Sequence, residues 1–104
     1  MENPENYPKT NITLKMLIDS GLFIPGQRVF SQDGSVSGFL NTDGSITVHL
    51  KDQDKTFEYL SGAARYIEKR SLNGWLYWHV LVDGQKVALD TFRDQYLDQN
   101  STTS

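Results

Sequence analysis

The chain has 104 residues, no cysteine, two histidines and a formal net charge of −3 at neutral pH. Its length is that of one ordinary domain, and its 38% hydrophobic content is that of a folded globular protein. The missing cysteines exclude a disulfide scaffold, thiolate metal sites and a cysteine nucleophile, and two histidines cannot form an all-imidazole metal triad. The mild acidity disfavours a nonspecific, polycation-like nucleic-acid binder.

Both ends of the chain read as polar tails around one domain. Residues 1–10 contain two prolines and two glutamates, and residues 99–104 end in a serine and threonine run. We expect disorder in both tails and a single domain over residues 11–98. The sequence shows no signal peptide and no apolar stretch near the ~20 residues of a membrane helix, so we expect an intracellular protein.

The first predicted element is a helix over residues 13–20. Thr13 is suited to the N-cap position, and Gly21 to the left-handed residue that ends a helix in a Schellman motif. Aliphatic residues at the i, i+3, i+4 spacing mark its buried face: Leu14, Leu17 and Ile18.

An antiparallel meander is predicted next. Asp33-Gly34 and Asp43-Gly44 are hairpin-turn signals ten residues apart. The segments that flank them read as strands: 28–32, 36–40 and 45–51. The last of these alternates apolar and polar residues, which predicts one buried and one solvated face. A short strand near residues 56–58 follows.

The second half of the chain combines two more helices with a hairpin. Residues 61–70 predict an amphipathic helix that ends on positive charge. Residues 75–82 read as one strand, which Asp83-Gly84 reverses into a second strand over 86–89. A terminal helix is predicted over 90–97. The predicted class is therefore α+β, with a small antiparallel β-meander plus a C-terminal hairpin packed with about three short helices.

The predicted strand over residues 75–82 places its side chains in two alternating rows. One row reads as core: Leu76, Trp78, Val80 and Val82. The other row carries rings: Trp75, Tyr77, His79 and Leu81. If a second layer covers this second row, the rings are structural. If the row is exposed, it forms a platform on which planar bases can stack, at about 1–3 kcal/mol per base.

Positive charge gathers just before this strand. Residues 63–80 contain three cations, Arg65, Lys69 and Arg70, but one acid, Glu68, although the whole chain is acidic. Such a patch beside an aromatic strand can hold a phosphate backbone, and it is equally compatible with an ordinary solvated helix face.

The segment Ser71-Leu72-Asn73-Gly74 joins the basic helix to the aromatic strand. It supplies side-chain and backbone donors in a tight turn, and Asn73 can pair bidentately with an adenine edge. Asn-Gly is also ordinary turn chemistry, so the segment alone does not decide between the two.

Catalytic patterns are missing from the sequence. His49 and His79 are the only imidazoles, and there is no Gly-x-Ser-x-Gly or Walker pattern. Asp52 and Asp54 lie in a predicted turn, where solvated carboxylates are usual. We expect a non-catalytic protein that uses no metal and no cofactor.

Two stretches of the chain resemble the RAMA ("restriction enzyme adenine methylase associated") domain family. The opening run of Thr13-Leu14, Leu17-Ile18, Gly21-Leu22 and Pro25-Gly26 is similar to the start of these domains. The later stretch resembles their central signature and includes Thr56-Phe57, Ser61-Gly62-Ala63-Ala64, Arg70-Ser71-Leu72-Asn73-Gly74-Trp75 and Trp78. The resemblance covers about residues 13–93. One departure is Tyr59-Leu60, where members commonly have Ser-Pro.

The resemblance implies a non-catalytic α+β module that occurs with DNA methylases, restriction systems and some chromatin-linked peptidase-like proteins. It implies DNA recognition, and the modified DNA that it implies as a ligand is of the N6-methyladenine type. The expected partners are DNA and a larger methylase, nuclease or peptidase-like protein. Within the signature, we expect Trp78 to be structural, Trp75 to contact ligand and Gly74 to serve the backbone conformation.

Together, the charge, the aromatic row and the resemblance give nine candidate DNA-binding residues: Arg65, Lys69, Arg70, Ser71, Asn73, Gly74, Trp75, Tyr77 and His79. Two other functions stay open. A protein–protein interaction module would use the same aromatic face, consistent with the negative net charge. A purely structural domain of a larger enzyme would bury Trp75 and bind neither partner.

Overall fold

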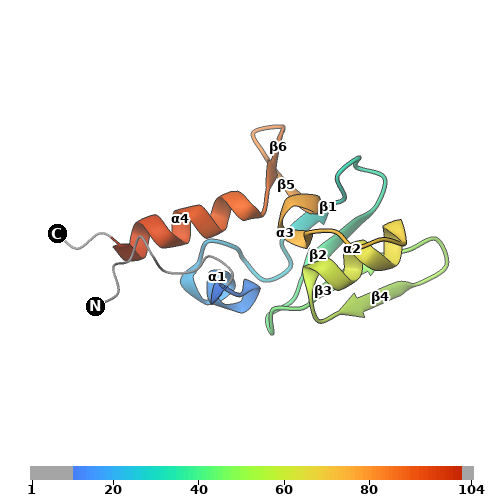
Figure 1. Ribbon diagram of the computed structural model, residues 1–104, viewed down its shortest axis with the longest axis horizontal. Helices are drawn as coiled ribbons and strands as arrows, with labels where there is room; N and C mark the ends of the chain where they lie inside the picture. The colour runs from blue at the N-terminus through green and yellow to red at the C-terminus, as the bar shows by residue number, and fades with distance from the viewer. Residues whose placement is uncertain (1–10, 102–104) are drawn as a thin grey trace.

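The computed structural model describes residues 11–101 (Figure 1). Its elements are α1 (Leu14–Ser20), β1 (Arg28–Phe30), β2 (Ser37–Leu40), β3 (Ile46–His49), β4 (Asp54–Phe57), α2 (Leu60–Glu68), α3 (Gly74–Tyr77), β5 (His79–Val82), β6 (Gln85–Ala88) and α4 (Asp90–Ser101). The meander and the hairpin join into one antiparallel sheet of order β4-β3-β2-β1-β5-β6. The predicted α+β class is confirmed.

The predicted tails fall mostly outside the described residues. Residues 1–10 and 102–104 lie there, whereas residues 99–101 belong to α4, which runs past the predicted end at position 97. No helix within residues 11–101 is long and apolar enough to cross a membrane.

Local signals in the sequence account for α1 as predicted. The Thr13 hydroxyl accepts a hydrogen bond from the Met16 N–H (3.2 Å), which caps the first turn. Gly21 has φ +91° and donates its N–H to the Ile18 carbonyl, while the Leu22 N–H reaches the Leu17 carbonyl at 3.1 Å. This is the predicted Schellman-type end.

The two Asp-Gly turns build the meander, because each aspartate ties down the residues after it. Asp33 accepts hydrogen bonds from the Ser35 N–H and hydroxyl, and Asp43 accepts the same pair from Ser45. These hydrogen bonds hold the pKa of both carboxyls below their ordinary value.

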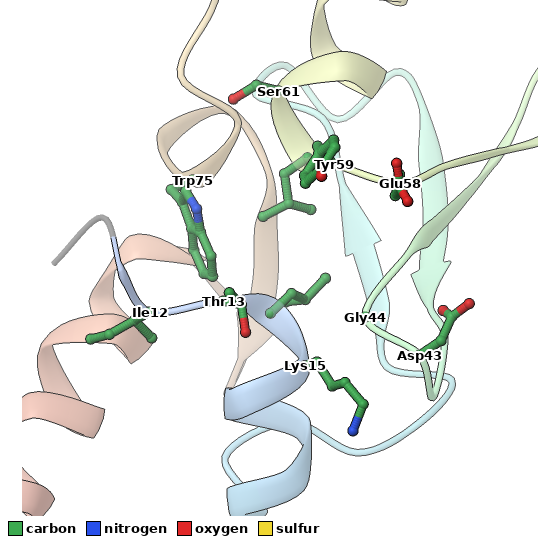
Figure 2. Close-up of a pocket in the computed structure, with 11 residues that line it drawn as sticks. Ile12, Thr13, Lys15, Asp43, Gly44, Glu58, Tyr59, Ser61 and Trp75 are labelled. Atoms are coloured by element: carbon green, nitrogen blue, oxygen red, sulfur yellow. The ribbon is translucent and has the colours of Figure 1, made fainter.

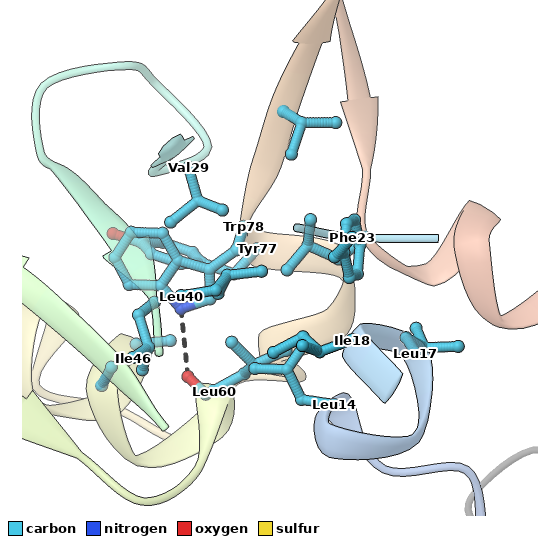
Figure 3. Packing of buried hydrophobic residues seen from close by; sticks show 14 of the residues in the cluster. Leu14, Leu17, Ile18, Phe23, Val29, Leu40, Ile46, Leu60, Tyr77 and Trp78 are labelled. Atoms are coloured by element: carbon cyan, nitrogen blue, oxygen red, sulfur yellow. Dashed lines mark hydrogen bonds between the residues drawn. The ribbon is translucent and has the colours of Figure 1, made fainter. Parts of the chain in front are cut away.

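The core lies where the helices pack on the sheet, with the Trp78 indole at its centre (Figure 3). Trp78 is fully buried, and its Nε1–H donates to the Leu60 carbonyl at 3.1 Å. Phe23 packs on Phe92 with ring centroids 4.7 Å apart, which brings α4 onto the same core.

The prediction of one strand over residues 75–82 is wrong. Asn73 accepts the Trp75 N–H at its side-chain oxygen (2.9 Å) and the Tyr77 N–H at its backbone carbonyl (3.0 Å), so it caps the one-turn helix α3. Strand β5 begins only at His79, and the alternation of two rows does not exist before it.

The exposures therefore differ from the predicted rows. Leu76 and Val82, predicted as core, are 53% and 45% exposed. Tyr77, predicted to share an aromatic row with Trp75, is buried beside Trp78, with the two rings edge to face at 5.0 Å. Of the two alternatives for the aromatic row, the stacking platform is not formed.

Candidate functional site

The Asn-Gly-Trp signature locks α3 against the start of α2. A Cβ atom on Gly74 would lie 2.3 Å from the Leu60 carbonyl carbon and 2.4 Å from the Ser61 nitrogen. The Gly74 N–H also donates to the Ser61 hydroxyl at 2.9 Å. Gly74 does not have a positive φ, so close helix approach, and not the expected backbone conformation, requires the glycine.

Two other residues predicted to contact DNA, Tyr77 and His79, make polar contacts within the domain. The Tyr77 hydroxyl donates to the Glu68 carboxylate at 2.7 Å, and burial beside this carboxylate raises the pKa of Tyr77 well above its ordinary range. His79 is half-buried, with Nδ1 3.0 Å from the Tyr77 carbonyl oxygen. Neither ring joins Trp75 in a stacking surface. The side-chain oxygen of Asn73 is likewise used as a cap.

Among the predicted contact residues, Trp75 borders the cleft with the greatest volume of those described below. It is half-buried, and the Arg93 guanidinium lies over its ring, 4.3 Å from the centroid. Arg93 is itself buried and hydrogen-bonds the Asp90 carboxylate through Nε (3.0 Å) and Nη2 (2.6 Å). The guanidinium therefore holds the indole from one side, and the indole also packs against the core and lines a cleft.

This cleft, which we call the Trp75 cleft, has a volume of about 470 Å³ and lies between α3, the start of α1 and the start of α2 (Figure 2). Buried Leu14 and Leu60 line it together with Trp75. Tyr59 stands across from Trp75 and is 70% exposed. Although Tyr59 occupies the N-cap position of α2, its side chain makes no capping hydrogen bond.

Carboxylates prevail among the charged groups of the Trp75 cleft. Asp43 and Glu58 line it, and the only ammonium group among its lining residues belongs to Lys15, which is paired with Asp19 at 2.7 Å. Such a cleft repels phosphate and can accept hydrogen bonds from amino groups.

The three predicted cations do not converge on one point. Arg65 lines a shallow hollow with Ser61 and Ser71, which brings two predicted residues together. Arg70 lies with Tyr77 in another hollow, next to Asp33 and Glu68. Lys69 points to a third place, beside Tyr66. Within residues 11–101, none of the three cations forms an ion pair.

Three residues that the structure places at these surfaces are not among the nine candidates from the sequence: Tyr59, Tyr66 and Lys55. The Lys69 and Lys55 ammonium nitrogens lie 4.6 and 5.5 Å from the Tyr66 ring centroid. The i, i+3 spacing of Tyr66 and Lys69 on one helix face was a usable signal. Lys55 lies on β4, and only the packing of α2 beside that strand brings it to Tyr66.

A curated relative gives a first comparison. The chain is 26% identical over 88 residues to the type II methyltransferase M.HinfI of Haemophilus influenzae. The match covers 85% of this chain and 23% of that protein. The chain therefore spans about a quarter of the relative it matches.

A family comparison covers nearly the whole chain. The model of the family described as Restriction Enzyme Adenine Methylase Associated matches residues 2–102. The signature that locks α3 onto α2 lies within this match, as does the helix α1 with its Thr13 cap. The chain belongs to the RAMA family.

Proposed function

We propose that this domain is a non-catalytic DNA-binding reader, and that it takes one DNA base into the Trp75 cleft. The observation that carries the proposal is the Trp75 ring, which Arg93 holds from one side at 4.3 Å while the ring borders a cleft of about 470 Å³. A fixed aromatic ring beside an open cleft suits a planar heterocycle, since stacking contributes about 1–3 kcal/mol per base.

The polar lining of the cleft favours a base over a phosphate. Glu58 and Asp43 can accept hydrogen bonds from the exocyclic amino groups of adenine or cytosine, whereas both repel the sugar-phosphate backbone. A base stacked inside a duplex cannot present both faces to such a cleft, so the proposal requires an unstacked or extruded base.

An N6-methyl group would find apolar contacts in this cleft. Leu14 and Leu60 line it, and burying one methyl group contributes about 0.8 kcal/mol, or a roughly fourfold preference. We therefore expect binding of unmodified DNA with a moderate preference for N6-methyladenine.

The family name and the similarity to a type II methyltransferase point to a restriction–modification context. We propose that the domain works beside a larger methylase, either in the same chain or as a separate partner. In that arrangement, the reader would hold the enzyme at modified or modifiable sites.

Fluorescence anisotropy with labelled DNA tests the base site. Tyr59→Ala is the first variant, because this side chain is 70% exposed and caps nothing. Trp75→Ala is the second, and we expect Kd to rise about 5- to 150-fold, which corresponds to the loss of one stacked base. Leu76→Ala is the matched control, since Leu76 lies on the same helix, is exposed and does not line the cleft.

The result that contradicts the base site is equally specific. If Trp75→Ala and Tyr59→Ala bind DNA as tightly as Leu76→Ala, while all three variants unfold cooperatively, the base is not in the Trp75 cleft. If the unaltered domain binds no DNA at low salt, the reader function itself is wrong.

A protein contact is a second candidate function, on a different surface from the one predicted. Leu81 and Val82 on strand β5 are 52% and 45% exposed, in the hairpin that projects from the sheet in Figure 1. Successive strand residues face opposite sides, so each of these side chains offers an apolar contact on its own face of the hairpin, which suits a polypeptide surface of a methylase. Raising the salt concentration separates the two candidates, because apolar contacts persist while phosphate contacts weaken.

A further inference from the structure

We infer that a phosphodiester backbone binds at the end of α2 opposite the Trp75 cleft, on a surface formed by Lys51, Lys55, Tyr66 and Lys69, here called the lysine–tyrosine patch. This inference rests on the proposed DNA binding and adds a location for the DNA strand beyond the base. Two of its lysines, Lys51 and Lys55, stand outside the basic segment that the sequence singled out.

The backbone of Lys69 is the first observation. Lys69 ends α2 with φ +63° and ψ 28°, the left-handed conformation that glycine or asparagine usually occupies at this position. A glycine would end the helix without the steric penalty of a Cβ atom. The lysine at this position therefore costs backbone stability that a glycine would not, which is consistent with a role for its side chain.

The position of the lysine side chains is the second observation. The ammonium groups of Lys69 and Lys55 lie 4.6 and 5.5 Å from the Tyr66 ring centroid, so they are at most about 10 Å apart. Two like charges held on one ring repel each other, and an anion beside them relieves this repulsion. The adjacent hollow of about 330 Å³ is lined by Lys51, Lys69 and Tyr66.

Three carboxylates of the described residues lie near the patch, but none of them pairs with its lysines. Asp52 lines the same hollow, and Asp54 on β4 is paired with His49 at 2.8 Å. Glu68, next to Lys69 in the chain, accepts the Tyr77 hydroxyl. Within residues 11–101, no carboxylate forms an ion pair with a lysine of the patch.

Tyr66 gives the patch a rigid centre. It is 41% exposed, and its ring packs on Phe57 with centroids 5.3 Å apart. Its hydroxyl can donate a hydrogen bond to a phosphate oxygen while the lysines supply charge.

The length of α2 relates the patch to the cleft. Tyr59 precedes the first residue of α2 and Lys69 follows the last, so the ten residue steps between them separate the two sites by about 15 Å. Along a B-form duplex each strand advances about 3.4 Å per nucleotide, so on duplex DNA the patch would contact phosphates about four nucleotides from the base in the Trp75 cleft.

Lys69→Gly is the decisive variant, because it removes the ammonium group and suits the left-handed backbone. Lys55→Gln removes the second charge. Lys86→Gln is the charge-matched control, since Lys86 is exposed on β6, at the opposite edge of the sheet from β4. Anisotropy is measured from 50 to 200 mM NaCl with a 16-base-pair duplex, and thermal unfolding is recorded for each variant.

We expect Lys69→Gly to unfold at the same or a higher temperature than the unaltered domain, while its Kd for DNA rises about 3- to 10-fold at 50 mM NaCl. The slope of log K against log salt should fall in magnitude by about 0.9, the value for one phosphate contact. Lys55→Gln should act in the same direction, and Lys86→Gln should change neither quantity.

Two results would overturn the inference, and they have different meanings. If the unaltered domain binds DNA and Lys69→Gly has the same Kd and salt slope, the backbone does not cross the patch, although the reader function stands. If the unaltered domain binds no DNA, the reader function and the patch fail together.

A length series tests whether the patch and the Trp75 cleft are more than one nucleotide apart on a bound strand. Single strands carry one N6-methyladenine flanked on each side by one nucleotide or by six. The Lys69→Gly effect should appear only with the longer strand, and an equal effect with both strands would contradict the placement.

Discussion

Replacing Gly74 by alanine tests whether the family signature is a structural lock. The added Cβ atom would lie 2.3 Å from the Leu60 carbonyl carbon and 2.4 Å from the Ser61 nitrogen, both of which are backbone atoms. Ordinary van der Waals contact begins at 3.4 Å, so α3 and the start of α2 must separate by about 1 Å.

The expected loss of stability follows from this separation. Forced overpacking costs about 1–3 kcal/mol. The movement also disrupts two hydrogen bonds, from the Gly74 N–H to Ser61 and from the Trp78 indole to Leu60, at about 1 kcal/mol each. Alanine has a better helix propensity than glycine, which offsets about 0.5–1 kcal/mol of this loss of stability. The free energy of unfolding should therefore fall by about 2–4 kcal/mol, and Tm by about 10–30 °C.

Thermal unfolding followed by circular dichroism measures this effect, and Gly62→Ala provides the control. Gly62 lies inside α2, and a Cβ atom there meets nothing within 4 Å. That variant should gain about 0.5–1 kcal/mol from helix propensity alone. The same chemical change is thus predicted to act with opposite signs on neighbouring helices. An unchanged or raised Tm for Gly74→Ala would refute the lock.

Three further predictions concern the fold. Asn73→Ala removes the cap of α3 and should lower the free energy of unfolding, measured in urea, by about 1 kcal/mol. The DNA affinity of the folded variant should stay unchanged. A large loss of affinity would instead support the adenine-pairing role of Asn73. Tyr77→Phe removes the hydroxyl that donates to Glu68 and should cost about 1 kcal/mol by chemical denaturation, and no cost would mean that this hydrogen bond is not formed. The lowered pKa values of Asp33 and Asp43 mean that both carboxylates stabilise the fold above their ordinary value of 3.8 and lose this effect as pH falls through their folded pKa values. Tm should fall below about pH 4 and fall less steeply when both are asparagine, and identical pH profiles would contradict the turn hydrogen bonds.

The elements that could be predicted from the sequence are those fixed by neighbours in the chain. Thr13 and Gly21 identify the two ends of α1, because a capping hydroxyl and a left-handed glycine act within four residues. The Asp-Gly turns act over the same short range, and they set the register of the meander.

The strand predicted over residues 75–82 shows where this reasoning fails. Its aromatic and aliphatic residues favour a strand, but Asn73 caps a helical turn, and the close approach of Gly74 to Leu60 fixes that turn on α2. That contact joins positions fourteen apart, so no local pattern indicates it. Tyr77 therefore enters the core, while Trp75 lines the cleft.

The candidate site could be predicted only in part for the same reason. Trp75 was found through the signature and Lys69 through its charge. Tyr59 was visible only as a departure from the family pattern, and the structure makes it the exposed wall of the cleft. Lys55 joins Lys69 across Tyr66 because β4 and α2 pack together, which the linear spacing does not show.

An NMR titration tests the central claim most directly. DNA containing one N6-methyladenine is added to the ¹⁵N-labelled domain, and amide and indole shifts are followed. We predict that the largest changes fall on Tyr59 and the Trp75 indole, with a second group at Tyr66 and Lys69. Changes confined to the β5–β6 hairpin around Leu81, or no changes at low salt, would contradict the account.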